Sequence, residues 1–458
     1  MLNDNTIIAI STPTGIGAIS IVRLSGDKAL EIVDVFFKNK SKKKLINQKT
    51  NTSHYGQIVD KGTLIDEVIV TIYKNPNSFT GEDTVEISCH GSKYIQQKIL
   101  HLFIKNGVAP AKPGEFSLRS FLNGKRDLIQ AEAIADLISS ESEASHSLAI
   151  KQMKGGFSIE IKKLRKKLLD FASLIELELD FSEEDIEFAD RNQFKLLLNK
   201  IEKTISKLTD SFSLGNVLKN GIPIAIIGPP NSGKSTLLNT LLNEDKAIVS
   251  EIAGTTRDII EDQINLNGIN FRFIDTAGLR KTKNKIEKIG IKKTYNKLKN
   301  ASYILYMIDS QSYIKKKSNI KLEINSILKK IKNTPIMILF NKIDIYKISD
   351  NDMSDLNMDK VQISAKNKTG IKTLINKLIL NFKNDKDQTL ITNARHYSAL
   401  LKTNKSVSNI KKGLSNNIPG DLLSIDIKEA IENLGEITGE ITNDELLGNI
   451  FGKFCIGK

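Results

Sequence analysis

The stretch IPIAIIGPPNSGKSTLLNTLLN, residues 222–243, decides the fold of the middle of the chain. Its apolar run at 222–227 predicts a buried strand, and the leucines that follow at helical spacing predict a helix. The inner side of that helix is predicted to carry Leu237, Leu238, Leu241 and Leu242. Between strand and helix, residues 228–235 fit the pattern G-x-x-x-x-G-K-S. In this pattern backbone N–H groups hold phosphate oxygens, so the sequence predicts an α/β nucleotide-binding domain.

The phosphate loop carries the first candidate ligands. Lys234 is expected to reach the β and γ phosphates of a nucleotide, and the Ser235 hydroxyl is expected to ligate Mg²⁺. The residues expected to contact the nucleotide here are Asn231, Ser232, Gly233, Lys234, Ser235 and Thr236.

Two further motifs indicate guanine as the base. NKID, residues 341–344, follows the apolar run PIMILF, and SAK, residues 364–366, follows KVQI. The Asp344 carboxylate can accept hydrogen bonds from both the N1–H and the exocyclic amine of guanine, a pair of donors that adenine does not present. The second motif is expected to add a contact to the base. The residues assigned in this way are Asn341, Lys342, Ile343, Asp344, Ser364, Ala365 and Lys366.

Two more motifs lie between the phosphate loop and NKID. DTAG, residues 275–278, ends the run INFRFI, and its Asp275 is expected to hold Mg²⁺ through water. SEIAGTTRD, residues 250–258, places Thr256 to reach Mg²⁺. The residues assigned to GTP here are Ser250, Glu251, Ile252, Ala253, Gly254, Thr255, Thr256, Asp275, Thr276, Ala277 and Gly278. Because the phosphate loop, DTAG, NKID and SAK each end a predicted strand in this order, they predict a GTP-binding domain.

Hydrolysis of GTP needs a positioned water and positive charge at the β–γ bridge. Leu279 stands where Ras-like proteins carry the water-orienting Gln, so that group must come from elsewhere. The side-chain oxygen of Asn231 could ligate a monovalent cation beside the phosphates, and K⁺ there would supply charge. The alternative is that Asn231 only braces the loop.

The regions around this domain differ in pattern. A chain of 458 residues is expected to form about three domains. Residues 1–122 contain β-branched and alternating segments and predict an α+β domain. Residues 123–218 and 383–458 show helical spacing and are expected to pack together as one discontinuous helical domain. The GTP-binding domain (the G domain), residues 219–382, is then inserted between the two helical segments. Such an insertion is possible because the termini of a domain often lie close together.

Two helices can be predicted in detail. Leu198, Ile201, Ile205 and Leu208 recur at helical spacing and predict one buried face. Near the end of the chain, Thr442 with Glu445 predicts a capping box.

Composition excludes several classes of protein. The sequence contains no run of about eighteen apolar residues, so no membrane span is predicted. No export signal is visible at the N-terminus. Cys89 and Cys455 are too few for a disulfide framework or a CxxC site. The sequence therefore predicts a cytoplasmic protein. The net charge of +14 is compatible with RNA binding, but lysines spread over all helices are equally typical of solvated faces.

The segment SFTGEDTVEISCHG, residues 78–91, brings acidic residues near Cys89 and His90. A metal site is conceivable there. A turn followed by an edge strand is the favoured interpretation.

Several motifs together resemble the MnmE (TrmE) family of tRNA uridine-modification GTPases, within the TrmE-Era-like superfamily. They run in order along essentially the whole chain: RLSG (23–26), SFTGEDTVEISCHG (78–91), KPGEFSLRSFLNGKRDLIQAEAIADLI (112–138), DFSEED (180–185), GTTRD (254–258), DTAGLR (275–280) and FCIGK (454–458). The PGEF…FLNGK…QAEA and CIGK motifs are far more specific to this family than the phosphate-loop, DTAG, NKID and SAK motifs, which many GTPases share.

The resemblance implies a reaction and partners. Such proteins act with the flavin- and NADH-dependent protein MnmG (GidA), which carries FAD. Together they add an aminomethyl or carboxymethylaminomethyl group to C5 of the wobble uridine of certain tRNAs. The one-carbon unit comes from 5,10-methylenetetrahydrofolate, for which 5-formyltetrahydrofolate is an analogue. The N-terminal domain is implied to bind this folate and to form the homodimer.

The resemblance also implies site residues. The folate contacts fall on Arg23, Glu86, Lys125 and Lys458. The K⁺ ligands fall on Asn231, Ser250, Ile252 and Thr255. Glu287 is the implied catalytic carboxylate, acting with Lys234, and it could orient water in place of the missing Gln. Cys455 would lie near the folate, either as a nucleophile or as a small buried residue that shapes the pocket.

A ribosome-assembly GTPase that binds rRNA without modifying it is the alternative. Such a GTPase would share every one of the GTP-binding motifs described above. Such proteins usually carry a KH-like domain or a second G domain, and the sequence indicates neither.

Overall fold

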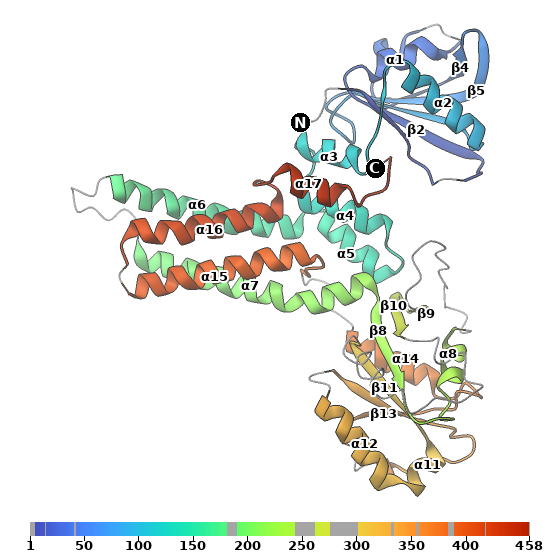
Figure 1. Cartoon of the computed structure of the whole chain (residues 1–458), viewed down its shortest axis with the longest axis vertical. Helices are drawn as coiled ribbons and strands as arrows, with labels where there is room; N and C mark the ends of the chain where they lie inside the picture. Colours follow the sequence, from blue (N-terminus) through green and yellow to red (C-terminus); the bar gives the residue numbers. More distant parts are fainter. Residues whose placement is uncertain are drawn as a thin grey trace. The chain divides into compact units, whose positions relative to one another are not determined.

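The computed structural model describes residues 5–13, 15–40, 43–180, 190–242, 262–274, 301–330, 334–353, 356, 358–382, 389–416 and 418–457 (Figure 1). The chain divides into two compact units. The first unit comprises Met1–Ile138, Lys151–Glu202 and Ala399–Lys458, and the second comprises Ser139–Ile150 and Lys203–Ser398.

A seven-stranded sheet forms the N-terminal part of the first unit. Its strands lie in the order β3-β4-β5-β6-β2-β1-β7. Their bounds are β1 Ile7–Ile10, β2 Ile19–Ser25, β3 Phe37–Lys38, β4 Thr52–Asp60, β5 Thr63–Tyr73, β6 Thr84–His90 and β7 Ala109–Pro110. Only β7 pairs in parallel, with β1. Helices α1 (Ala29–Phe36) and α2 (Lys93–Lys105) bury one face of the sheet with residues such as Val33 and Phe103, and a short 3₁₀ helix spans Leu45–Asn47.

The predicted edge strand within residues 78–91 is wrong in its position. This segment forms β6, which lies inside the sheet between β5 and β2. Cys89 on β6 is buried, and His90 Nδ1 lies 2.7 Å from Asp66 Oδ1. Among the described residues, no group of three or more His, Cys, Asp and Glu side chains could hold a metal ion, so the alternative of a metal site gains no support.

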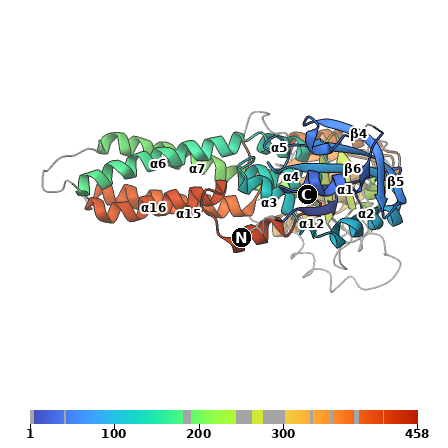
Figure 2. The same ribbon diagram turned by 90° about the horizontal axis from the view of Figure 1, so that it is seen from above.

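Helices make up the rest of the first unit. Their bounds are α3 Glu115–Leu122, α4 Leu128–Ile138, α6 Gly156–Asp180, α7 Arg191–Asn220, α15 Ala394–Ser415, α16 Gly420–Thr438 and α17 Asp444–Phe451. Two of these helices, α7 and α15, cross the boundary of the unit, because Lys203–Ser398 belong to the second unit. Helices α6, α7, α15 and α16 lie side by side in both views (Figure 2). The predicted face of α7 is confirmed, because Leu198, Ile201, Ile205 and Leu208 are all buried.

The predicted capping box at the start of the last helix is wrong. Asn443 is the N-cap of α17, and its Oδ1 accepts a hydrogen bond from the Leu446 N–H at 2.7 Å. The Asn443 side chain, one position closer to the helix, therefore makes the N-cap hydrogen bond that was predicted for Thr442.

The C-terminal segment packs against the start of the chain. The Gly114 N–H donates to the carbonyl oxygen of Cys455 at 3.3 Å, and the Ser11 hydroxyl donates to that of Gly457 at 3.2 Å. Gly457 has a φ of +91°, and a Cβ there would lie 2.3 Å from the Ile10 carbonyl oxygen. Only glycine allows so close an approach at this φ.

The second unit contains a six-stranded sheet in the order β13-β12-β11-β8-β10-β9, parallel except for β9. The strands are β8 Ile222–Ile227, β9 Asp262–Leu266, β10 Ile269–Ile274, β11 Tyr303–Asp309, β12 Ile336–Asn341 and β13 Asp359–Gln362. The helices are α8 Lys234–Leu242, α11 Ser310–Lys315, α12 Lys317–Lys330, α13 Asp350–Met353 and α14 Ile371–Phe382. The predicted strand at 222–227 and the helix with buried Leu237, Leu238 and Leu241 are both confirmed.

The first part of α5 (Glu143–Met153) also belongs to the second unit. Ala144 and Leu148 pack against the core of the G domain. The Ala144 N–H donates to the carbonyl oxygen of Gly268, in the turn between β9 and β10, at 3.0 Å. This turn therefore satisfies a donor in the first turn of α5.

None of the described helices combines the length and the apolar character that crossing a bilayer requires.

The two cysteines are expected to differ in reactivity. Cys455 is exposed, whereas burial, with the nearby Asp66 charge, raises the pKa of Cys89 to about 11. Iodoacetamide at about pH 8 should therefore label Cys455 and leave Cys89 unmodified, because the thiolate is the reactive form. Peptide mass spectrometry measures this, with the chain unfolded in urea as the control in which both react. Equal labelling of the folded chain would contradict the buried position of Cys89.

Candidate functional site

The carboxyl ends of the parallel strands in the second unit bring the described nucleotide motifs together. The phosphate loop follows β8, NKID begins at the end of β12, and SAK follows β13. Open α/β sheets bind ligands at this edge.

Two glycines of the phosphate loop fit where no side chain could. Gly228 has a φ of +145°, and a Cβ there would lie 2.1 Å from the Met307 carbonyl oxygen. Gly233 has a φ of +100°, and a Cβ there would lie 2.2 Å from Asn341 Nδ2. Lys234 lies across the loop, with Nζ donating to the carbonyl oxygens of Gly228 and Pro229 at 2.8 and 2.7 Å. These contacts hold the ammonium group over the loop.

Asn341 joins three motifs through one buried side chain, which is 3% exposed. Its Nδ2 donates to the carbonyl oxygen of Ser232 in the phosphate loop at 2.8 Å. Its Oδ1 accepts from the N–H of Ala365 in SAK at 2.9 Å. Because all these groups are buried, losing either bond would leave a polar group unsatisfied. The sequence placed Asn341 in a base-binding motif and gave no sign of this linking role.

The carboxylate of Asp344, the predicted contact to the base, is held by a residue of the SAK motif. Ser364 donates from Oγ to Asp344 Oδ1 at 2.6 Å, and Asp344 is exposed. An exposed, oriented carboxylate is suited to accept hydrogen bonds from a base.

Asp309, at the end of β11, was not predicted from the sequence. Its Oδ2 accepts from Lys342 Nζ at 2.6 Å, and its Oδ1 caps α11 by accepting from Gln311 and Ser312 N–H groups. Partial burial raises the pKa of Asp309, but the hydrogen bond from Lys342 and those from the helix outweigh it, so the pKa lies below its ordinary value. The sequence feature that could have revealed Asp309 is its position directly after the apolar run YILYMI.

Asn231 lies in the phosphate loop, shortly before the first turn of α8. Its side chain is exposed, and its φ is +62°. An exposed amide at this position is accessible to a ligand. Ser235 and Thr236 follow at the start of α8, where the helix dipole favours anions.

Several candidate residues lie outside the described residues. They are the ranges 250–256 and 275–278, together with Leu279, Glu287 and Lys458.

A second cluster lies around Arg23 on β2, in the first unit. Its Nε donates to Glu86 Oε1 at 2.9 Å, and its Nη1 donates to the carbonyl oxygen of Gly457 at 3.5 Å. The guanidinium carbon lies 5.7 and 5.6 Å from the ring centres of Phe79 and Phe116. The structure therefore brings Arg23, Glu86 and the C-terminal segment together, as the resemblance implied.

Lys125 and Cys455 are placed differently. Lys125 Nζ donates to the Pro76 carbonyl oxygen at 2.8 Å, and no described contact joins it to Arg23. The Cys455 side chain is exposed, so the alternative of a buried cysteine is wrong for this chain.

Comparisons with known proteins identify the family. Residues 128–455 match the family described as "MnmE helical domain", and residues 6–125 match "GTP-binding protein TrmE N-terminus". The chain is 54% identical over 467 residues to the "tRNA modification GTPase MnmE" of Flavobacterium johnsoniae, and 54% identical over 469 residues to that of Flavobacterium psychrophilum. The alignment covers 100% of this chain and 100% of each relative.

Among solved structures, the chain is similar to Era in complex with MgGDPNP and nucleotides 1506–1542 of 16S ribosomal RNA. That likeness covers 40% of this chain and 66% of the other, at 27% identity and a TM-score of 0.26, and the assignment does not rest on it. It rests on the two matched families and on the full-length relatives. The chain belongs to the MnmE family of tRNA modification GTPases.

Proposed function

We propose that this chain hydrolyses GTP to drive modification of the wobble uridine of tRNA in the cytoplasm, as a homodimer working with an FAD-binding partner of the MnmG (GidA) kind. The product is an aminomethyl or carboxymethylaminomethyl group on C5. The observation that carries the GTPase part is the buried Asn341 amide, which holds the phosphate loop and both base motifs in one site. The family membership supports tRNA as the substrate.

In the proposed site, Lys234 holds the β and γ phosphates of GTP, and Asp344 selects guanine. Bound Mg²⁺ and K⁺ would supply the positive charge that stabilises phosphoryl transfer. Ser235 and Thr256 are the proposed Mg²⁺ ligands. Asn231, Ser250, Ile252 and Thr255 are the proposed K⁺ ligands, and the exposed position of Asn231 in the phosphate loop supports this assignment.

The one-carbon chemistry is assigned to the cluster around Arg23, with Glu86, Lys125 and Lys458 as folate contacts. Arg23 supports this because its guanidinium lies near two aromatic rings and within reach of the C-terminal segment. Such a surface suits a flat heteroaromatic ring that carries acidic groups. The donor would be 5,10-methylenetetrahydrofolate. The exposed thiol of Cys455 is available to it as a candidate nucleophile.

The direct test is nucleoside mass spectrometry of bulk tRNA. The host is a bacterium without its own uridine-modifying GTPase, supplied with this chain and its own flavoprotein gene. C5-modified wobble uridine should return with the intact chain and stay absent with Lys234→Ala. Absence of the modification with the intact, well-expressed chain would refute the proposal and favour the ribosome-assembly alternative.

Asp344→Asn is expected to weaken GTP binding by about a hundredfold or more, because an amide presents a donor where guanine needs a second acceptor. Affinity for xanthosine triphosphate should rise, since xanthine has a carbonyl at that position. Titration with fluorescent nucleotides measures both. Asp359→Asn, an exposed change on β13, is the matched control. Unchanged GTP affinity in Asp344→Asn would mean that the base binds elsewhere.

Glu287→Ala is expected to retain GTP affinity and to lose turnover by about a hundredfold, because the proposed water-orienting carboxylate is gone. Turnover of the unaltered chain should also fall when NaCl replaces KCl. Phosphate release at saturating GTP measures both effects. Survival of turnover in Glu287→Ala would show that another group orients the water.

A further inference from the structure

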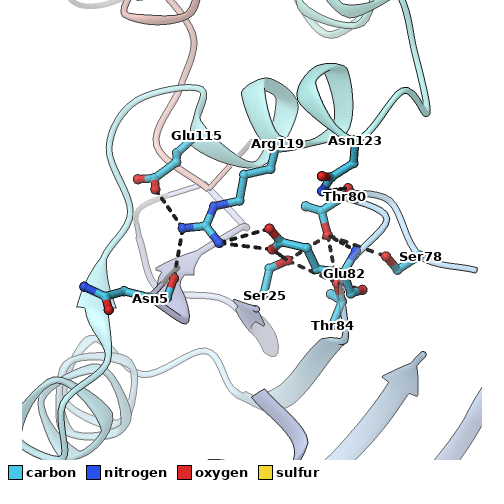
Figure 3. A network of polar contacts seen from close by, with 9 residues as sticks. All are labelled: Asn5, Ser25, Ser78, Thr80, Glu82, Thr84, Glu115, Arg119 and Asn123. Atoms are coloured by element: carbon cyan, nitrogen blue, oxygen red, sulfur yellow. Dashed lines mark hydrogen bonds and ion pairs between the residues drawn. The ribbon is translucent and has the colours of Figure 1, made fainter. Parts of the chain in front are cut away.

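Arg119 on α3 is buried, at 3% exposure, and joins separate segments of the first unit (Figure 3). Its Nη1 donates to both carboxylate oxygens of Glu82, at 3.2 and 3.1 Å. Its Nη2 donates to Glu115 Oε1 at 3.1 Å and to the carbonyl oxygen of Asn5 at 2.9 Å. One guanidinium thus serves two carboxylates, one on its own helix and one on the loop between β5 and β6.

That loop is also held on its other side. Ser25, two positions after Arg23 along the chain, donates from Oγ to Glu82 Oε2 at 2.8 Å (Figure 3). The Ser25 and Thr80 hydroxyls lie 2.7 Å apart, and Asn123 Nδ2 donates to the Thr80 carbonyl oxygen at 2.8 Å. These bonds fix residues 80–82 against both β2 and the end of α3.

Both pieces that Arg119 joins supply an aromatic ring to Arg23. Phe79 lies on the loop, three residues before Glu82, and Phe116 lies on α3, one turn before Arg119. Their ring centres are 5.7 and 5.6 Å from the Arg23 guanidinium carbon. The loop and α3 thus each place one ring beside the Arg23 guanidinium, and the contact between Glu82 and Arg119 joins the two pieces that carry these rings.

We propose that Arg119 is a positioning residue for the folate site. Through Glu82 it holds the loop so that Phe79 and Phe116 flank Arg23, and it does not itself touch the folate. This inference rests on the proposed function, which assigns Arg23 to folate binding. Binding groups supported by packed and hydrogen-bonded neighbours lose affinity when that support loosens, even if every contacting residue is retained.

The informative variant changes Glu82 and leaves Arg119 in place. Replacing Arg119 would leave two largely buried carboxylates without their guanidinium and could simply unfold the chain. Glu82→Gln keeps the shape and an oxygen for Ser25, and removes the charge that draws the loop to α3. Glu115→Gln is the matched control, because it makes the same change beside the same guanidinium but lies on α3 itself.

The experiment measures the Kd of 5-formyltetrahydrofolate by calorimetry, and the Tm, for the full chain and its variants. Glu82→Gln is expected to weaken binding by about five- to tenfold, and Glu115→Gln by less than about twofold, at similar Tm. In a Phe79→Ala background, Glu82→Gln should weaken binding no further, because both changes act through the same ring. Arg23→Ala tests the proposed folate site itself, because that proposal assigns Arg23 as a folate contact.

Three results would overturn the inference. If Arg23→Ala abolishes binding while Glu82→Gln stays within about twofold of the unaltered chain, the folate site stands and the positioning role falls. If Glu82→Gln and Glu115→Gln weaken folate binding equally, the effect is a general loss of stability. The same conclusion follows if the effects of Glu82→Gln and Phe79→Ala on the Kd are fully additive. Unchanged binding in Arg23→Ala would remove the proposed folate site, and the inference with it.

Discussion

The carbonyl oxygen of Gly457 joins the two ends of the chain. It accepts from Ser11 Oγ, directly after β1, and from Arg23 Nη1 on β2. The C-terminal helices must therefore return to the N-terminal sheet, and whatever lies between must leave and re-enter the first unit. Closing so long a loop costs little more entropy than closing a shorter one, because the cost rises only with the logarithm of length. The described units fit this constraint, because Lys203–Ser398 of the second unit lie between two segments of the first unit along the chain.

In each unit, a residue proposed to contact a ligand also has a structural role. Asn341 in the second unit ties the phosphate loop to SAK, and Arg23 in the first bonds both Glu86 and the C-terminal segment. Loss of function on replacing either residue would therefore be ambiguous. Asp344 is exposed and accepts from Ser364, so its replacement separates base binding from folding more cleanly.

The sequence predicted those features that depend on local pattern. The strand at 222–227, the leucines of α8 and the buried face of α7 follow from hydrophobic periodicity, which alone determines which side of an element is buried. The order of the GTP-binding motifs likewise predicted that the phosphate loop, NKID and SAK follow strands of one sheet. The motifs that resemble the family also predicted that Arg23, Glu86 and the C-terminal segment meet.

Features set by distant partners could not be predicted in this way. The position of β6 inside its sheet depends on pairing with β2, which is far away in the sequence. The choice of Asn443 over Thr442 as N-cap depends on backbone angles that neither residue type fixes. Asp309 and Arg119 looked like ordinary charged residues, because their roles come from Lys342 and Glu82 on other elements. Such ion pairs become visible only once the chain has folded.

The bond from Ala144 to the Gly268 carbonyl makes the G domain larger than its contiguous sequence. Part of α5, which comes well before β8 in the chain, completes the core with Ala144 and Leu148. A change in the turn at Gly268 would therefore also disturb the first turn of α5. A fragment cut to residues 219–382 would lack Ala144 and Leu148, and the part of the core that they cover would be left open to water. A fragment meant to fold alone should carry the start of α5 as well.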